Sequence, residues 1–299
     1  MKRILLATLT VAVLALSAGN VFADELWNPH LRGSDEGLAA GVVPPKGVYF
    51  VNDSYFSSMS YCDAKGHSTG TKLDLMVDVP IVLWNPGFKV RGADYAVAVA
   101  QPFDYTSVYS NTAPGVGNGH VGTYNTVIVP GMLSWALPND LHLKASLSTL
   151  ANDPSTSPAH PADYKGAGSG NSYWTIEPGV ALSWLHNGWN VSGDFKYDYN
   201  LKDSSTNYQS GDQFSGDYTI TQTKNKFTKG IGAYSTNQLK EDRIKGVDTP
   251  GTIRVTYGAG PILGYEFGGI SVQAQYNWNL KTENDFGGNT LNIRFVGVL

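Results

Sequence analysis

Two pairs of side chains in this 299-residue sequence have the types needed for hydrolytic or acid–base chemistry. A barrel hydrolase needs a His close to a Ser nucleophile, with an acid or amide that orients the His. His142 and Ser146 share a face but lie four residues apart on its polar side, whereas His186 falls in a turn. Glu177 and Asp194 resemble an acid–base pair, but mixed charges are also ordinary on a polar surface. We therefore predict that the protein is not an enzyme.

The sequence also lacks the patterns that hold cofactors. Gly258-x-Gly260 is followed by neither a predicted helix nor a Lys-Ser/Thr pair, so it does not predict a phosphate-binding loop. Cys62 is the only cysteine, which excludes an intramolecular disulfide, and the six His residues show no ligand spacing for a metal. The formal net charge of −4 does not indicate a nucleic-acid surface. We expect no cofactor, no metal and no nucleic-acid partner.

The first residues predict export. Lys2 and Arg3 form a positive n-region, Ile4–Ala18 is apolar and uncharged, and Val21–Ala23 has the residue sizes that a signal peptidase reads before Asp24. The alternative is a membrane anchor, but the apolar run is short of the roughly 20 residues that span a bilayer. We expect residues 1–23 to be a signal peptide. Without it the net charge becomes −6.

Polar and apolar residues alternate with period two along much of the remaining chain, which predicts strands with one apolar face and one polar face. The pattern is most regular in Trp189–Leu201 and Ile270–Lys281, and it is weaker in Leu73–Leu83, Trp174–Trp184, Ile253–Phe267 and Leu291–Leu299. In an outer-membrane barrel the polar face lines the lumen and the apolar face contacts lipid. The following residues are then expected to line the lumen and a solute path: Asp74, Asp78, Lys144, Glu177, Asp194, Lys196, Asp198, Arg254, Glu266, Gln273, Gln275 and Arg294.

The connections between these segments predict the topology. Tight turns such as Asn85-Pro86-Gly87, Asn187-Gly188 and Gly268-Gly269 alternate with longer loops such as Ser58–Thr71, Ala151–Asn171 and Thr282–Asn289. Short periplasmic turns and long external loops are typical of outer-membrane barrels. We expect an all-β fold: a transmembrane antiparallel up-and-down β-barrel of about 12 strands over residues 47–299, with both termini in the periplasm. The alternative is a secreted β-sandwich, which would have to bury one of two faces: the polar face with its charged residues, or the apolar face with Trp and Tyr near the strand ends.

Residues 24–46 precede the first predicted strand and contain too many Gly, Pro and polar residues to form a strand themselves. They could be a disordered periplasmic leader or a plug folded back into the barrel. As a plug, Arg32, Asp35 and Glu36 would pair with lumen charges, and Trp27 would stack on an aromatic solute.

Two stretches resemble a known family. Glu36–Gly41 followed by Val43–Phe50 matches its Gly-rich opening and the P-P-x-G-x-Y pattern before the first strand, and Asn207–Phe214 resembles its Y-x-S-G-D-E-F stretch. The chain is thereby similar, over its mature length, to the outer-membrane transporters named for the meta pathway of phenol degradation, which include SphA-like proteins. It departs from many outer-membrane proteins by ending in Leu299 rather than an aromatic residue.

The resemblance implies a channel or transporter in the Gram-negative outer membrane, linked to uptake of aromatic or other apolar compounds. Its expected partners are outer-membrane lipid, a small organic solute and the barrel assembly machinery, and we expect a monomer. One alternative is a surface or structural barrel with a closed, adhesin-like lumen, and another is a barrel hydrolase. The sequence does not name the solute and assigns no role to Cys62.

Overall fold

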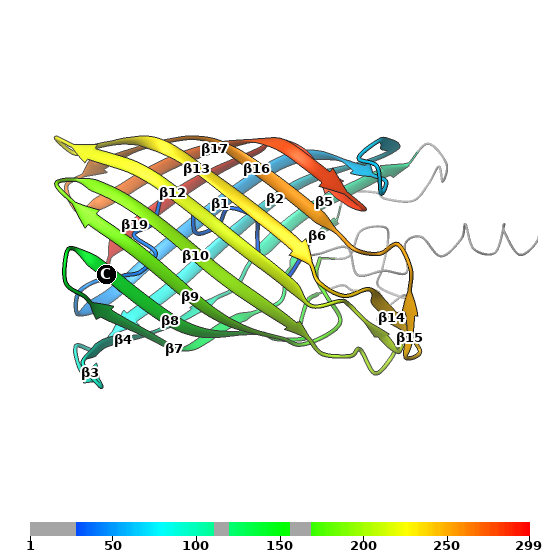
Figure 1. Cartoon of the computed structure of the whole chain (residues 1–299), viewed down its shortest axis with the longest axis horizontal. Coiled ribbons are helices and arrows are strands. Elements are labelled where there is room, and N and C mark those ends of the chain that lie inside the picture. Colours follow the sequence, from blue (N-terminus) through cyan, green and yellow to red (C-terminus); the bar gives the residue numbers. More distant parts are fainter. Residues whose placement is uncertain (1–27, 111–119, 156–168) are drawn as a thin grey trace, which may run out of the picture.

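A computed structural model describes residues 28–110, 120–155 and 169–299 of the chain. Their strands form a closed, antiparallel barrel of 12 wall strands, because the last strand pairs with the first (Figure 1). The predicted signal peptide and its cleavage site lie outside the described residues. Among the described residues, no helix is long and apolar enough to cross a membrane.

Ten wall strands are single elements, and two are each made of two consecutive elements. In chain order the wall consists of β1 (Gly47–Cys62), β2 (Ser68–Asn85), β4 (Ala93–Ala100) with β5 (Phe103–Ser110), β6 (His120–Thr123) with β7 (Val127–Ala136), β8 (Leu141–Leu150), β9 (Thr175–His186), β10 (Trp189–Asn200), β12 (Gln213–Lys224), β13 (Phe227–Gln238), β16 (Val255–Phe267), β17 (Ile270–Glu283) and β19 (Thr290–Val298). The shorter elements are β3 (Lys89–Val90), β11 (Tyr208–Gln209), β14 (Asp242–Ile244), β15 (Val247–Thr249) and β18 (Asp285–Gly287).

The split of the third wall strand has a simple cause. Both β4 and β5 pair with β2, and the two residues between them are Gln101 and Pro102. Pro has no backbone N–H, so it cannot donate to the ladder. The Gln101 N–H donates instead to the carbonyl of Pro80 on β2, which keeps the wall closed across the break.

Turns at one end of the barrel are short, as predicted. Asn187 and Gly188 have φ angles of 49° and 79°, and Asn225 and Lys226 also have positive φ, as two-residue hairpin turns require. One predicted short turn is wrong: the chain after Asn85 does not turn directly at Asn85-Pro86-Gly87 but forms β3 before it enters β4. The first long loop is shorter than predicted, because β1 and β2 extend to Cys62 and Ser68.

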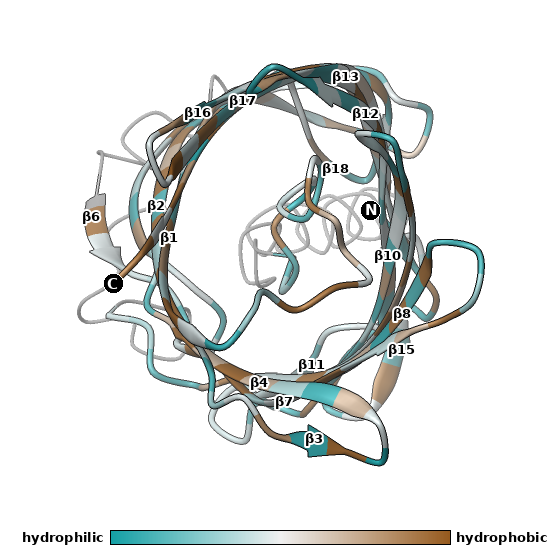
Figure 2. Cartoon of the chain, turned by 90° about the vertical axis from the view of Figure 1, so that its left-hand side faces the viewer, coloured by the Kyte–Doolittle hydropathy of each residue, from teal (hydrophilic) through white to brown (hydrophobic). Residues whose placement is uncertain are grey.

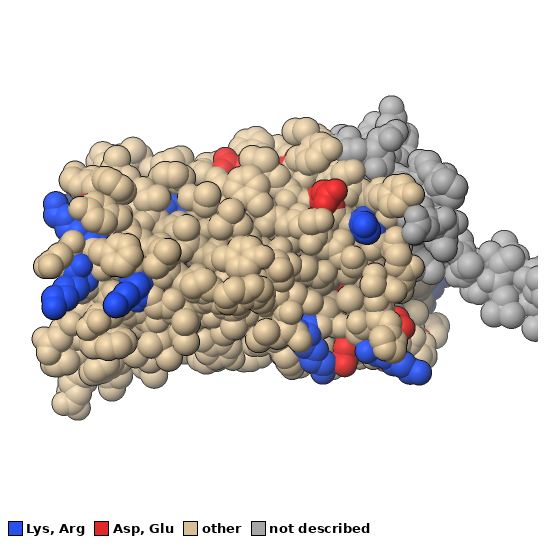
Figure 3. All heavy atoms as spheres, turned by 90° about the horizontal axis from the view of Figure 1, so that it is seen from above, with Lys and Arg blue, Asp and Glu red and all other residues tan. Residues whose placement is uncertain are grey.

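The predicted facing holds along β9. Its odd-numbered residues from Thr175 to Ser183 are buried, whereas Ile176, Val180 and Leu182 on the other side are 40–52% exposed. The outer surface of the barrel is therefore apolar here, as lipid requires. Figure 3 shows a related pattern on one face: the visible Lys and Arg lie mainly toward the two ends of the barrel, and the central band is almost free of charge.

Candidate functional site

The lumen contains the N-terminal segment, defined here as residues 28–46. Figure 2 shows this chain inside the ring of strands. At the end with the long loops, the Tyr124 hydroxyl donates to the carbonyl of Asn28 at 3.1 Å. At the end with the short turns, the Asn85 amide donates to the carbonyl of Pro44 at 2.7 Å. The segment therefore runs along most of the length of the lumen.

A charged cluster on β9, β10 and β12 holds the middle of this segment. The imidazole of His30 lies 3.4 Å from the carboxylate of Asp217 and 3.5 Å from that of Glu177. The Lys196 ammonium lies 3.0 Å from the carboxylate of Asp35 and 3.8 Å from those of Glu177 and Asp194. All of these wall residues are on the inward face, so their polar atoms bind the segment instead of bulk water.

Lys144 and Asp198 extend this cluster along the wall. The Lys144 ammonium lies 3.2 Å from the carboxylate of Asp194, across β8 to β10. Asp198 is fully buried on the inward face of β10. His30, Asp35 and Asp217 also present ligand atoms within 4.8 Å of one another. Because Lys196 already neutralises Asp35, we assign no metal to this group.

A second set of contacts holds the segment against β17 and β19. The Asn277 amide donates to both carboxylate oxygens of Glu36 at 3.0 Å. Gln273 and Gln275 donate to the carbonyls of Glu36 and Gly33. Arg294 donates to the carbonyls of Glu36 and Ser34 and pairs with Asp53 at 2.9 Å. Most polar side chains on this wall are therefore occupied by the segment.

Arg32 and Arg254 occupy the end with the long loops. The guanidinium of Arg32 lies 2.5 Å from the carboxylate of Asp285 on β18. The guanidinium of Arg254 lies 3.2 Å from Asp242, which also accepts a hydrogen bond from Tyr208. Asp242 belongs to the small sheet of β11, β14 and β15. Arg254 therefore anchors a loop structure over the barrel and does not face an open channel.

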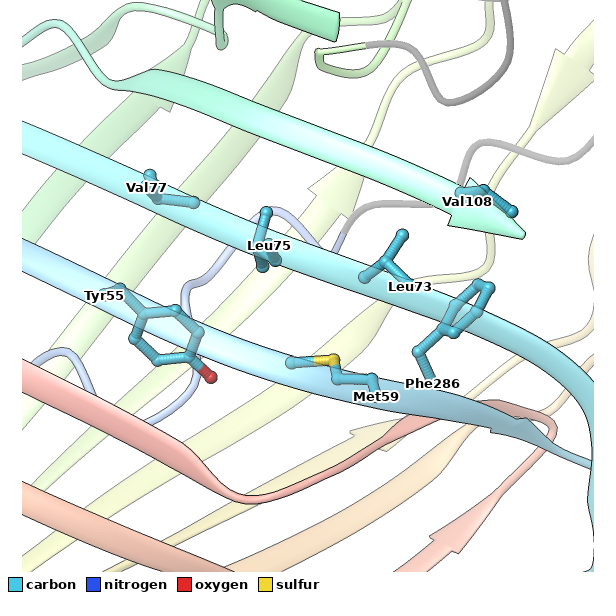
Figure 4. Close-up of a cluster of buried hydrophobic side chains, with 7 residues drawn as sticks. All are labelled: Tyr55, Met59, Leu73, Leu75, Val77, Val108 and Phe286. Carbon is cyan, nitrogen blue, oxygen red and sulfur yellow. The ribbon is translucent and has the colours of Figure 1, made fainter. Parts of the chain in front are cut away.

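Part of the inner face of β1, β2 and β5 is apolar, in contrast with the rest of the lumen. Figure 4 shows the buried side chains that form this face, which we call the apolar lane: Tyr55, Met59, Leu73, Leu75, Val77, Val108 and Phe286. Leu31 of the N-terminal segment packs against it. A pocket of about 50 Å³ lies between the lane and the segment, where Arg32 and Asp285 provide its polar edge.

The lane explains why two of the predicted lumen residues face the other way. Because Leu73, Leu75 and Val77 point inward, Asp74 and Asp78 point outward. Asp78 accepts hydrogen bonds from Asn52 and Ser54, which are on the same outer face. The predicted alternation of polar and apolar residues is correct for this strand. The prediction that its polar face lines the lumen is wrong. Asp74 and Asp78 are therefore not lumen residues.

One more of the predicted lumen residues is absent from the packed interior. Glu266 is exposed at the end of β16, next to the turn into β17. Trp27 lies outside the described residues. His186, a candidate catalytic residue, pairs with Asp140 at 2.7 Å on the exposed rim with the short turns.

The sequence prediction missed Asp217 and Asp285, which contact the N-terminal segment, and Asp53, which pairs with Arg294. A signal for Asp217 exists: Ser215, Asp217, Thr219 and Thr221 alternate with the apolar residues Phe214, Tyr218 and Ile220. Asp285 is in a segment predicted as loop, and its position depends on the pairing of β18 with β1.

Residues 45–295 match the family described as "Putative MetA-pathway of phenol degradation". Among curated protein sequences, none matches this chain. The fold is similar to that of the COG4313 outer membrane channel from Pseudomonas putida F1, with a TM-score of 0.74 and 17% identity over 86% of this chain and 97% of that one. The translocator domain of the autotransporter NalP from Neisseria meningitidis has a TM-score of 0.48 at 12% identity, and covers 86% of this chain and 90% of that one.

The family match spans most of the barrel, from the residues just before β1 into β19. It agrees with the resemblance found in the opening residues and with the 12-strand architecture. The chain forms a closed antiparallel β-barrel of the kind found in outer-membrane channels, and it belongs to the family named for the MetA pathway of phenol degradation.

Proposed function

We propose that this protein is an outer-membrane channel through which small apolar organic compounds, including aromatic ones, diffuse along the lumen. The observation that carries this proposal is the apolar lane. Lumens of outer-membrane barrels are normally polar. The apolar lane, made of Leu, Val, Met and aromatic side chains, offers few polar groups to bind ions or sugars. An apolar solute can instead move from lipid onto this surface at little cost in free energy, because both environments are apolar.

The pocket beside the lane is closed down in this structure. Its volume of about 50 Å³ is less than the roughly 150 Å³ of an engineered cavity that binds benzene. A ring-shaped solute therefore requires the N-terminal segment to shift away from the lane. We propose that the segment is a plug whose displacement opens the channel, and that the rest of it remains anchored by its polar contacts.

The finer points of organisation belong to the same proposal. Residues 1–23 are the signal peptide, with cleavage after Ala23, residues 24–46 are the segment that enters the barrel, and residues 47–299 form the wall. The protein acts as a monomer that the barrel assembly machinery inserts. Catalysis is not part of the proposed function, and neither is a cofactor.

Uptake of toluene tests the role of the lane. Cells with an intact lipopolysaccharide leaflet should accumulate radiolabelled toluene faster when they express the protein. Leu73→Asn places an amide in the lane without touching the outer surface, because Leu73 is 3% exposed and faces inward. We expect this variant to lose most of the gain in toluene uptake. Glycerol uptake, which does not need an apolar surface, should differ little between cells with the native protein and cells with the Leu73→Asn variant.

Equal toluene uptake with and without the protein would contradict the proposed function. It would favour the second candidate, a structural barrel with a closed lumen, which is supported by the dense contacts between segment and wall. Folding of the Leu73→Asn variant is checked by its different migration on a gel before and after boiling, as expected for closed barrels.

Channel conductance should rise with pH between about 5 and 9. Burial beside Asp217 raises the pKa of Glu36 from 4.5 to about 8, so docking of the segment takes up a proton and weakens as pH rises through this interval. Burial alone would lower the pKa of His30, but its contacts with Asp217 and Glu177 outweigh this effect and hold the pKa well above 6.5. Docking through protonated His30 is also strongest below pH 6.5 and is lost on alkalinisation.

Asp35 does not oppose this trend. Lys196 and His30 lower its pKa despite burial, so its contribution to docking is present above pH 3.8 and is constant over the tested range. Single-channel recording in planar bilayers measures the effect. Glu36→Gln, which cannot ionise, should show a smaller rise in conductance than the native protein. A conductance that falls on going from pH 5 to pH 9 would contradict this prediction.

A further inference from the structure

The outer surface of β1 and β2 is the polar counterpart of the apolar lane. Six residues with outward side chains on these two strands are polar or charged: Asn52, Ser54, Ser58, Lys72, Asp74 and Asp78. On β9, by contrast, the outward residues between Thr175 and Leu185 are all apolar. A polar stripe on a lipid-facing wall has a cost in free energy, so it calls for a specific explanation.

One part of the stripe satisfies itself. The carboxylate of Asp78 accepts hydrogen bonds from Asn52 and Ser54, each at 2.7 Å. This arrangement needs no external partner. Asp74 differs, because no described side chain forms a hydrogen bond or ion pair with its carboxylate.

Asp74 lines a groove of about 520 Å³ in the outer wall. The other side chains at the groove are mostly aromatic or apolar, and Ser58 and Asn289 supply further polar groups. The apolar ones are Phe56, Met76, Tyr105, Tyr276 and Leu291. The groove thus combines aromatic and apolar side chains with the carboxylate of Asp74, which accepts no hydrogen bond from a described side chain.

The depth of the groove indicates what can reach it. Asp74 lies ten residues along β2 from Trp84, an exposed aromatic residue near the end with the short turns. At about 3.3 Å per residue and a tilt of about 40°, this separation spans about 25 Å along the membrane normal. The apolar band of such barrels is also about 25 Å tall, so Asp74 lies near the outer membrane–water interface. Amphipathic aromatic molecules favour this level.

The chemistry of the groove selects among molecules found there. A lipid phosphate would be repelled by the carboxylate, and an acyl chain has no hydrogen to donate to it. An aromatic ring with a hydroxyl or amino group meets both requirements, since its ring packs on Tyr105 or Tyr276 while its donor reaches Asp74.

We propose that this groove binds small aromatic compounds that carry a hydroxyl or amino donor, at the lipid-facing surface of the barrel. The inference rests on the proposed function, for which it supplies a collecting site on the wall that carries the lane. Leu75 contributes to both the groove and the pocket in the lumen, so the two sites lie on opposite sides of the same strands.

Binding of 1-naphthol and naphthalene to the full-length mature protein in lipid nanodiscs tests the proposal. The two probes share a fluorescent ring, but only 1-naphthol has a donor. Asp74→Leu removes the acceptor and should fold well, because Leu suits a lipid-facing position. We expect the affinity for 1-naphthol to fall at least tenfold, as for a lost hydrogen bond to a charged group. The affinity for naphthalene should stay within about twofold.

Asp94→Leu is the matched control. It also removes an exposed carboxylate, but one that pairs with Lys89 at the other end of the barrel, so 1-naphthol affinity should not change. Equal 1-naphthol affinities in the native protein and Asp74→Leu overturn the proposal. Weaker lipopolysaccharide binding by Asp74→Leu, with no change for 1-naphthol, assigns the groove to lipid instead. Neither result affects toluene uptake through the lane, so failure of this site is distinguishable from failure of the proposed function.

Discussion

Deletion of residues 24–38 behind an intact signal sequence should raise the conductance of the channel several-fold in planar bilayers. These residues include His30, Arg32, Asp35 and Glu36, whose side chains contact the inner wall. Without them, water fills the lumen and ions can pass along it. The wall itself should still close, because the pairing of β1 with β19 does not involve the deleted residues.

Two controls separate opening of the lumen from damage to the barrel. The deletion variant should keep the difference in gel migration before and after boiling that a closed barrel shows. It should also lose the rise in conductance with pH, since Glu36 and His30 are absent. Unchanged conductance in a correctly folded deletion variant would show that the N-terminal segment does not obstruct ion flow.

Much of the wall could be predicted because one physical rule acts on each strand separately. On β9 and β10 one face meets lipid and the other meets polar groups, so alternation alone identifies Glu177, Asp194 and Lys196 as inward residues. The tight turns were also readable, because positive φ angles favour residues such as Asn and Gly. These features depend on local chemistry that a single segment displays.

The reversed wall could not be read in this way. A period of two shows that Leu73, Leu75 and Val77 share a face, but it does not show which face is inside. Their inward orientation depends on Leu31 and on Phe286, which lie far away in the sequence and cover the lane from within the barrel. Long-range packing of this kind leaves no mark on the strand itself.

The extent of the strands depended on long-range pairing as well. The sequence prediction placed Ser58–Cys62 in the first long loop. In the structure Ser60 pairs with both Lys72 and Gly287, so the ladders on both sides hold this stretch in the sheet. The sequence prediction placed the loop correctly but made it too long.

The inner and outer surfaces of β1 and β2 can serve one function, which would explain why their apolar side chains point inward and their polar side chains outward. The apolar lane lies inside this wall, and the groove with the Asp74 carboxylate lies outside it. Both surfaces for amphipathic solutes are therefore on the same pair of strands. Elsewhere the wall separates lipid from a polar lumen, as in other outer-membrane barrels. The proposed path for solutes therefore lies along this wall, where the protein departs from the general pattern.

Val180→Arg should strongly reduce the amount of folded protein in the outer membrane. Val180 is 52% exposed in the middle of β9, on the apolar face that contacts lipid. An Arg at the bilayer midplane destabilises a barrel by about 2–4 kcal/mol, which is a large share of the stability of most proteins. The heat-modifiable band in outer-membrane fractions measures the loss, and urea titration in lipid vesicles measures the change in free energy of unfolding.

Ser148→Arg is the control for the charge itself. Ser148 faces inward on β8, directly opposite Glu177 on β9, so the new guanidinium meets a carboxylate in place of lipid. We expect this variant to accumulate in the outer membrane at close to the native level, with at most a small change in the urea midpoint. If Ser148→Arg prevents folding while Val180→Arg does not, the inner and outer faces of β8 and β9 have been assigned the wrong way round. The lumen cluster around Lys196 would then have to be reconsidered together with them.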